Sequence, residues 1–131
     1  MKIKIIDWKL FEKSNAVYFT RDVNITNSFD VYAIEIGKKH TQLLVYMDFI
    51  SFKYLGFIKY NEAICIIDNN ISNDWLYNKN LVLNIFTNDL YYQKYSYENV
   101  FAAEWMIQSS FFVDLSENPV KAEEEFLSHM K

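Results

Sequence analysis

Glycine, proline, cysteine and arginine are scarce in this chain of 131 residues, which contains two glycines, one proline, one cysteine and one arginine. Loops that cradle a phosphate need closely spaced glycines, because backbone N–H groups must approach the anion. Gly37 and Gly56 lie nineteen residues apart, and no serine is flanked by glycines on both sides. The sequence therefore contains no P-loop, no dinucleotide-binding fingerprint and no nucleophile elbow.

The single cysteine, Cys65, cannot form an intramolecular disulfide, which fits a reducing cytoplasm. Its neighbours on both sides are apolar, so we expect a buried side chain rather than a reactive thiol. The first residues have no signal-peptide pattern, and no uncharged run approaches the length of a membrane-spanning helix. We expect a cytoplasmic protein that does not interact with membranes.

Residues that could bind a metal or catalyse a reaction are scattered along the chain. His40, Cys65 and His129 never fall within five residues of one another, whereas zinc sites usually contain a closely spaced pair. Carboxylates are numerous, but acid–base catalysis needs two of them at a defined separation, and most acidic residues only solvate a surface. We predict no catalytic residue, no metal and no cofactor, and hence a protein that is not an enzyme.

The two halves of the chain differ in charge. Residues 1–60 contain nine Lys/Arg and six Asp/Glu, whereas residues 61–131 contain four Lys and eleven Asp/Glu, for a total of −4. An acidic half repels nucleic acid and attracts a basic partner. The lysines near the start are too few to predict phosphate binding, which normally requires several basic residues on one face. The charge pattern predicts a basic protein partner and no nucleic acid.

The length and the absence of a linker predict a single domain over residues 1–131. Apolar and β-branched runs recur about every ten residues in the first half, which is typical of an antiparallel meander. Alternation in 29–37 and 41–49 supports strands there. The predicted strands span residues 2–11, 15–23, 29–37, 41–49, 51–60, 62–68 and 81–86.

Two helices are predicted after residue 95. Ser96 as an N-cap and the four-residue spacing of Phe101 and Trp105 indicate a helix over about 97–109. Asn118 as a cap and Pro119 in the first helical position predict the last helix. The predicted fold class is α+β: a curved antiparallel β-meander of six or seven strands, with C-terminal helices packed on one face.

Two segments carry a resemblance to a known class of protein. Residues 66–75 form an apolar strand, a polar turn and an Asp-Trp pair, and residues 111–119 form an aromatic pair, an acidic turn and an Asn-Pro helix start. Both are similar to segments of the small acidic immunity proteins encoded beside bacterial polymorphic toxins, including contact-dependent growth inhibition systems. This class shares no single fold. The resemblance implies a cytoplasmic protein that binds one toxin domain and blocks its activity.

The charge pattern and this resemblance together predict an immunity protein that neutralises a basic, nuclease-type toxin domain. Acidic residues around an aromatic anchor are the usual form of a tight interface. Two alternatives remain: a phage or mobile-element inhibitor of a host nuclease, and a small-ligand binding module with an apolar pocket on the sheet. The oligomeric state stays open. The predicted partner-binding residues are Asp68, Asp74, Trp75, Asp89, Glu98 and Glu104.

Overall fold

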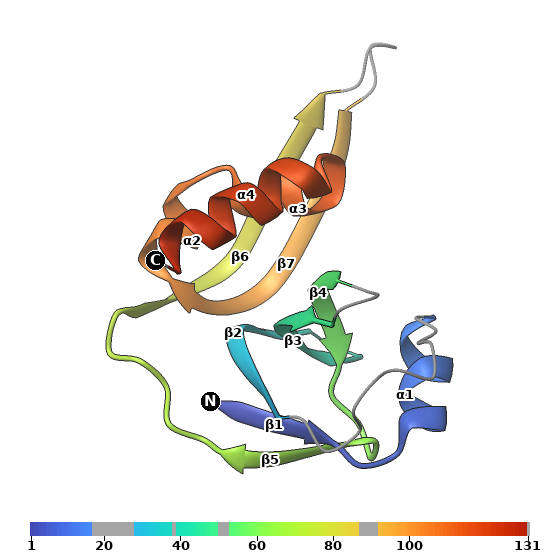
Figure 1. Cartoon of the computed structure of the whole chain (residues 1–131). Coiled ribbons are helices and arrows are strands. Elements are labelled where there is room, and N and C mark those ends of the chain that lie inside the picture. Colours follow the sequence, from blue (N-terminus) through green and yellow to red (C-terminus); the bar gives the residue numbers. More distant parts are fainter. Residues whose placement is uncertain (17–27, 38, 50–52, 87–91, 131) are drawn as a thin grey trace.

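The computed structural model describes residues 1–16, 28–37, 39–49, 53–86 and 92–130, and of residues 78–86 and 92–98 it describes the backbone. An antiparallel sheet of seven strands carries the helices of the C-terminal part on one face (Figure 1), which confirms the predicted α+β class. The elements are β1 (Lys2–Ile5), α1 (Trp8–Asn15), β2 (Ser28–Ile36), β3 (Thr41–Asp48), β4 (Lys53–Lys59), β5 (Ile64–Asp68), β6 (Trp75–Phe86), β7 (Tyr92–Ala103), α2 (Glu104–Gln108), α3 (Phe111–Glu117) and α4 (Pro119–His129).

Strand β2 is the centre of the sheet. Strand β3, followed by β4, lies along one of its edges. On the other edge, β1 pairs with residues 28–30 and β7 pairs with residues 33–35. Beyond these, β5 pairs with β1 and β6 pairs with β7. The sheet therefore forks at β2 into a β1–β5 arm and a β6–β7 arm (Figure 1).

A bulge in β2 determines which face each part of this strand presents. Val31 pairs with Val45 and Ala33 pairs with Leu44, so Tyr32 is the extra residue. A bulge shifts the alternation of side chains by one position. Val31 consequently packs on one face of the sheet, whereas Tyr32 and Ala33 pack on the other.

The two faces of the sheet carry separate apolar cores. The first core lies under α1 and the β1–β5 arm, and the second lies between the sheet and helices α2–α4. The buried residues of the first core are Ile3, Ile5, Phe11, Phe29, Val31, Leu43, Val45, Met47, Phe49, Ile58, Ala63 and Ile64. Those of the second core are Ala33, Leu44, Val100, Ala102, Met106, Phe111, Phe112, Ala122 and Phe126.

The predicted strand over 2–11 is wrong beyond Ile5, because helix α1 begins at Trp8. Asp7 caps this helix, since its carboxylate accepts a hydrogen bond from a backbone N–H of the first turn at 3.0 Å. Trp8 and Phe11, one turn apart, make an edge-to-face ring contact at 5.7 Å, and Phe11 is fully buried. The cap and the burial of one helical face outweigh the local preference for a strand.

The predicted helix over 97–109 is also largely wrong. Residues 97–103 belong to β7, and the helix that follows, α2, extends only from Glu104 to Gln108. The ladder of β7 with β6 supplies a backbone partner along its length, and Phe101 pairs with both Tyr77 and Ile34. These tertiary contacts override the helical spacing of Phe101 and Trp105.

The other predicted elements correspond more closely to the structure. Strands β2 to β5 lie at the predicted positions within two residues, and the segment 81–86 is part of the longer β6. The last helix is confirmed: the Asn118 side chain accepts a hydrogen bond from the Lys121 N–H at 3.4 Å, and Pro119 follows it. Of the predicted strand 15–23, Asn15 belongs to α1, and residues 17–23 lie outside the described residues.

The meander itself is only partly local. Strands β2, β3 and β4 follow one another in the sheet, as predicted, but β1 pairs with β5 and β2 pairs with β7 across long stretches of sequence.

Among the described residues, no helix has both the length and the apolar character needed to cross a membrane.

Phe126 provides a test of the second core, because its ring lies 4.8 Å from that of Tyr32 and 5.3 Å from that of Tyr46. We predict that Phe126→Ala lowers the free energy of unfolding by about 3–5 kcal/mol through loss of contacts and the cavity it leaves. Val120→Ala on the same helix is the control, because Val120 is 70% exposed. Urea unfolding followed by circular dichroism measures both, and equal stabilities would contradict this account of the core.

Candidate functional site

Three of the six predicted partner-binding residues lie together at one end of the β6–β7 arm. Trp75, the first residue of β6, pairs with Ala103, the last residue of β7. Asp74 precedes this pair and Glu104 follows it, so both carboxylates lie just beyond the end of the ladder. Both are exposed, and Trp75 is half-buried against the first core.

The other three residues do not join this group. Asp68 ends β5 on the other arm, directly opposite Lys2 of β1, so it is interleaved with the basic part of the chain rather than grouped with the downstream acids. Its carboxylate accepts a hydrogen bond from the Asn70 N–H at 2.9 Å. Asp89 lies outside the described residues, and Glu98 is placed by its backbone in β7.

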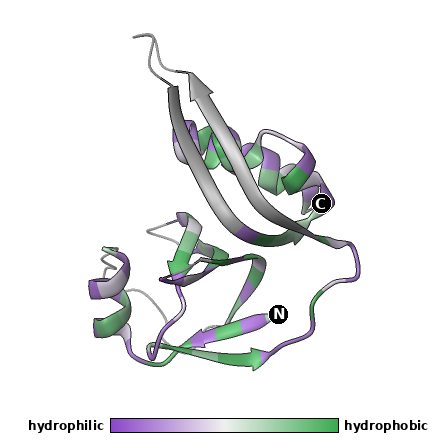
Figure 2. Ribbon diagram, turned by 180° about the vertical axis from the view of Figure 1, so that it is seen from behind, coloured by the Kyte–Doolittle hydropathy of each residue, from purple (hydrophilic) through white to green (hydrophobic). Residues whose placement is uncertain are grey.

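The face of the β6–β7 arm opposite the helices carries an aromatic group. Alternation along the paired strands places Trp75, Tyr77 and Phe101 on this face, while Val100 and Ala102 face the helices and are fully buried. The rings of Tyr77 and Phe101 lie 4.8 Å apart, and Tyr77 is 52% exposed. Helices lie in front of the arm in Figure 1 and behind it in Figure 2, so they cover one face alone.

Hydrogen bonds hold the exposed tyrosine in place. The Tyr77 hydroxyl donates to Asn99 Oδ1 at 2.5 Å, and Asn99 Nδ2 donates to the Ile36 carbonyl at 3.0 Å. The chain of bonds connects β6, β7 and β2, so the ring of Tyr77 is oriented before any partner arrives. A fixed aromatic ring loses little conformational entropy on binding. We refer to Asp74, Trp75, Tyr77, Phe101 and Glu104 as the Trp75 corner.

The helices beside this corner are strongly acidic. Residues 104–129, which contain α2, α3 and α4, include six Asp/Glu and one lysine. Four lysines of the first half instead lie on β1 and α1, which are at the opposite end of the molecule in Figure 1. That end also contains Asp7, Glu12, Glu62 and Asp68, so its charge is mixed, whereas the helical layer is predominantly acidic.

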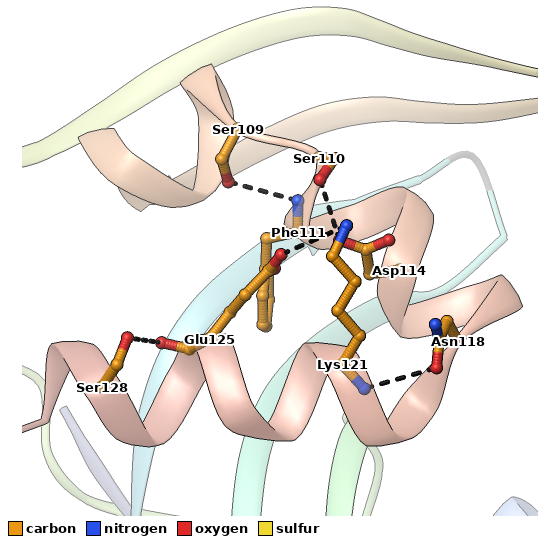
Figure 3. A network of polar contacts seen from close by, with 8 residues as sticks. All are labelled: Ser109, Ser110, Phe111, Asp114, Asn118, Lys121, Glu125 and Ser128. Atoms are coloured by element: carbon orange, nitrogen blue, oxygen red, sulfur yellow. Dashed lines mark hydrogen bonds and ion pairs between the residues drawn. The ribbon is translucent and has the colours of Figure 1, made fainter.

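One part of this acidic layer is an internal network that joins α3 to α4 (Figure 3). Asp114 is 8% exposed; it accepts a hydrogen bond from the Ser110 hydroxyl at 2.8 Å and forms an ion pair with Lys121 at 3.4 Å. Lys121 also lies 3.8 Å from Glu125, one turn along α4. One oxygen of Glu125, Oε2, is buried and accepts no hydrogen bond from the described residues.

The two carboxyl groups of this network differ in pKa. Burial and the hydrogen bond and negative charge of Asp114 raise the pKa of Glu125, against the opposing effect of Lys121 and His129. Burial also acts to raise the pKa of Asp114, but hydrogen bonds from Ser110 and Glu125 and the charge of Lys121 outweigh it and hold that pKa below its ordinary value.

An aromatic stack fastens the end of α4 to α2. The imidazole of His129 lies flat on the indole of Trp105, with ring centroids 4.0 Å apart and planes 1° from parallel. Trp105 also makes an edge-to-face contact with Phe111 at 4.9 Å. Together with the network above, this stack fixes the helices next to Glu104 and so stabilises one side of the Trp75 corner.

The sequence indicated tyrosines near Trp75 as contact residues without singling out Tyr77, and it did not indicate Asn99 or Phe101. The sequence pattern that could have identified these residues is a spacing of two. In a strand, this spacing puts Trp75 and Tyr77 on one face, and it puts Asn99 and Phe101 on one face of the partner strand. The prediction of a helix over this part of the chain concealed the second pair, because helical residues two apart do not share a face.

Cys65 is exposed, contrary to the expected burial, because it faces away from the first core on the outer strand β5. An open hollow of about 600 Å³ lies beside it, lined by residues 66–69. This hollow is at the edge of the sheet rather than over its central strands, whose two faces are filled by the cores.

Among the described residues, no three His, Cys, Asp or Glu side chains are grouped so that they could hold a metal ion.

No family model, no curated protein and no solved structure matched this chain.

The Asp114–Glu125 pair makes stability depend on pH in a predictable way. Because the pKa of Glu125 is raised above 4.5, its stabilising contribution is complete below that value and is lost as pH rises through the folded-state pKa. The pKa of Asp114 is lowered below 3.8, so its contribution is lost only as pH falls through its folded-state pKa. Glu125→Gln keeps a donor for Asp114 but cannot ionise, so its stability relative to the wild type should increase as pH rises.

Urea unfolding at several values from about pH 4.5 to 8 measures this difference. Glu124→Gln is the matched control, because Glu124 is an exposed neighbour on the same helix. A Glu125→Gln curve that runs parallel to that of the wild type would show that the pKa of Glu125 is not raised by folding.

Proposed function

We propose that this protein is an immunity protein that binds a basic, nuclease-type toxin domain through the Trp75 corner and so neutralises it. The observation that carries the proposal is the exposed ring of Tyr77, which lies beside the half-buried Trp75 with exposed carboxylates at the end of the strand pair. Tyr77 and Trp75 supply apolar contact area, and Asp74 and Glu104 supply charge at the rim. Aromatic anchors within a polar rim are typical of tight protein interfaces.

The charge distribution supports a basic partner for this corner. Besides Glu104, the neighbouring helices carry Glu117, Glu123 and Glu124 outside the network of Asp114, Lys121 and Glu125, and the lysines of β1 and α1 lie at the other end of the fold. An acidic surface accelerates association with a basic protein and orients it during the encounter. A nuclease has a positively charged substrate groove, so the same surface can compete with nucleic acid for it.

The residue composition of the corner supports binding rather than catalysis. Its carboxylates, Asp74 and Glu104, are both exposed, and each accepts a local side-chain hydrogen bond, from Ser72 and from Gln108 respectively. The polar contact within the corner, between Tyr77 and Asn99, orients a ring. A surface of this kind can recognise a protein without any reacting group.

The first test is co-expression of this chain with the toxin domain encoded beside its gene. The proposal predicts that the two proteins co-purify and that growth is rescued. If they neither co-purify nor restore growth, the proposed function is wrong. Binding to a host nuclease instead would favour the phage or mobile-element alternative.

Charge reversal tests the electrostatic part of the interface. We predict that the double variant Asp74→Lys/Glu104→Lys associates with the toxin domain at least about tenfold more slowly and with a weaker dependence on salt. The control is Asp30→Lys/Glu62→Lys, which changes the net charge equally at exposed positions outside the corner. Stopped-flow association rates at several ionic strengths measure both. Equal slowing by the two variants would mean that net charge alone matters.

Removal of the aromatic anchor tests the apolar part. We predict that Tyr77→Ala raises the dissociation rate of the complex by about tenfold or more, because truncation of a central aromatic residue commonly costs 2 kcal/mol or more. Tyr60→Ala is the matched control, since Tyr60 is 44% exposed at the end of β4. Surface plasmon resonance measures the rates, and an unchanged dissociation rate for Tyr77→Ala would move the interface away from this face.

A further inference from the structure

The outer strand of the β1–β5 arm presents an apolar edge. Among the described strands, β5 pairs with β1 alone. Edge strands are commonly protected by charge, proline, a bulge, short length or a covering segment. Strand β5 is short and has a bulge, but Ile64–Ile67 contains no charge and no proline. The bulge in this strand turns a further apolar side chain outward, since Ile66 is 37% exposed and Ile67 is 52% exposed. An apolar edge of this kind is a template for another strand.

A buried apolar row runs across the arm and ends at this edge. Phe29 of β2 pairs with Ile3 of β1, which pairs in turn with Ile66 of β5. Their exposed fractions are 7%, 0% and 37%, so the row is open at its last member. A second β5, antiparallel and related by a two-fold axis at Ile66, places another Ile66 against the first. It thereby continues the row into the first core of a second copy.

The charges beside the edge favour a second copy over a basic protein. Lys2 lies opposite Asp68 and Lys4 lies opposite Cys65 on the same face of the arm, so a basic partner would meet two lysines here. In the two-fold arrangement, β5 of one copy lies between its own β1 and β5 of the second copy. Lys4 on β1 is therefore two strand spacings from β5 of the second copy. The Cα atoms of Lys4 and of Asp68 in the second copy are then about 10 Å apart, within reach of a lysine side chain.

We infer that this chain forms a two-fold homodimer in which β5 pairs antiparallel with β5 of a second copy, with Ile66 and Ile67 at its centre. The strand is short, so the dimer belongs to the weak class that buries less than about 1,200 Å². The Trp75 corner lies on the other arm, and each copy still presents it.

Sedimentation velocity over a wide range of protein concentration measures the equilibrium. Ile67→Lys places a charge at the centre of the pairing and should raise the dissociation constant at least about tenfold. Val120→Lys makes the same change of charge at an exposed apolar position on α4 and should leave the constant unchanged. A wild-type protein that stays monomeric up to high micromolar concentration overturns the inference.

The single cysteine provides a second measurement on the native chain. With the two-fold axis at Ile66, the Cα atoms of the two Cys65 residues are about 8 Å apart. A bismaleimide of that length should yield a cross-linked dimer with the wild type and with Val120→Lys, but little with Ile67→Lys. Equal cross-linking of all three proteins, or a dimer that persists in Ile67→Lys, overturns the placement at β5.

The variants distinguish a failure of the dimer proposal from a failure of the proposed toxin binding. Asp74→Lys/Glu104→Lys should still form the dimer, because neither residue belongs to the β1–β5 arm. Ile67→Lys should still bind the toxin domain. Loss of dimerisation in the double variant would contradict the assignment of the two surfaces to different arms.

Discussion

Every strand of the sheet is hydrogen-bonded to β2, either directly or through one neighbour. Strands β1 and β7 share one of its edges and β3 takes the other, so β5, β6 and β4 each lie one strand further out. The bulge at Tyr32 allows this strand to serve two cores, because it changes the face that the side chains present between Val31 and Ala33. The position of this single extra residue therefore decides where α1 and the C-terminal helices can pack.

The fork at β2 also separates two kinds of surface. The β6–β7 arm carries the fixed aromatic ring of Tyr77 with Asp74 and Glu104 at its end, and the acidic helices cover its other face. The β1–β5 arm carries lysines beside Asp68 and an apolar edge. The first surface is predominantly acidic, whereas the second has mixed charge. Two interactions of different chemistry can thus occur on one small protein without competing for the same residues.

The sequence predicted those elements whose signals are local. The cap and proline at Asn118-Pro119 define the start of α4, and alternation in β2 and β3 defines two strands. Where the sequence failed, partners distant in the chain decided the structure. Residues 97–103 form a strand because β6 pairs with this segment on one side and β2 pairs with residues 100–102 on the other, and no local pattern carries that information.

For the candidate site, the structure shows only where the predicted residues lie. Asp74, Trp75 and Glu104 lie together because two strand ends meet, although the sequence suggested them through charge and resemblance. Asp68 appeared equivalent to Asp74 in the sequence, but the pairing of β5 with β1 places it opposite Lys2. Charge counts along a chain do not reveal which charges the topology will bring into contact.

The first core has a consequence for how the chain folds as it is synthesised. All of its buried members lie between Ile3 and Ile64, whereas the second core needs Phe126 near the end of the chain. The N-terminal part can therefore begin to condense on the ribosome while the acidic helices are still untranslated. Until helices α2–α4 have been synthesised, Leu44 and Tyr46 lack the helical residues that cover them in the folded protein.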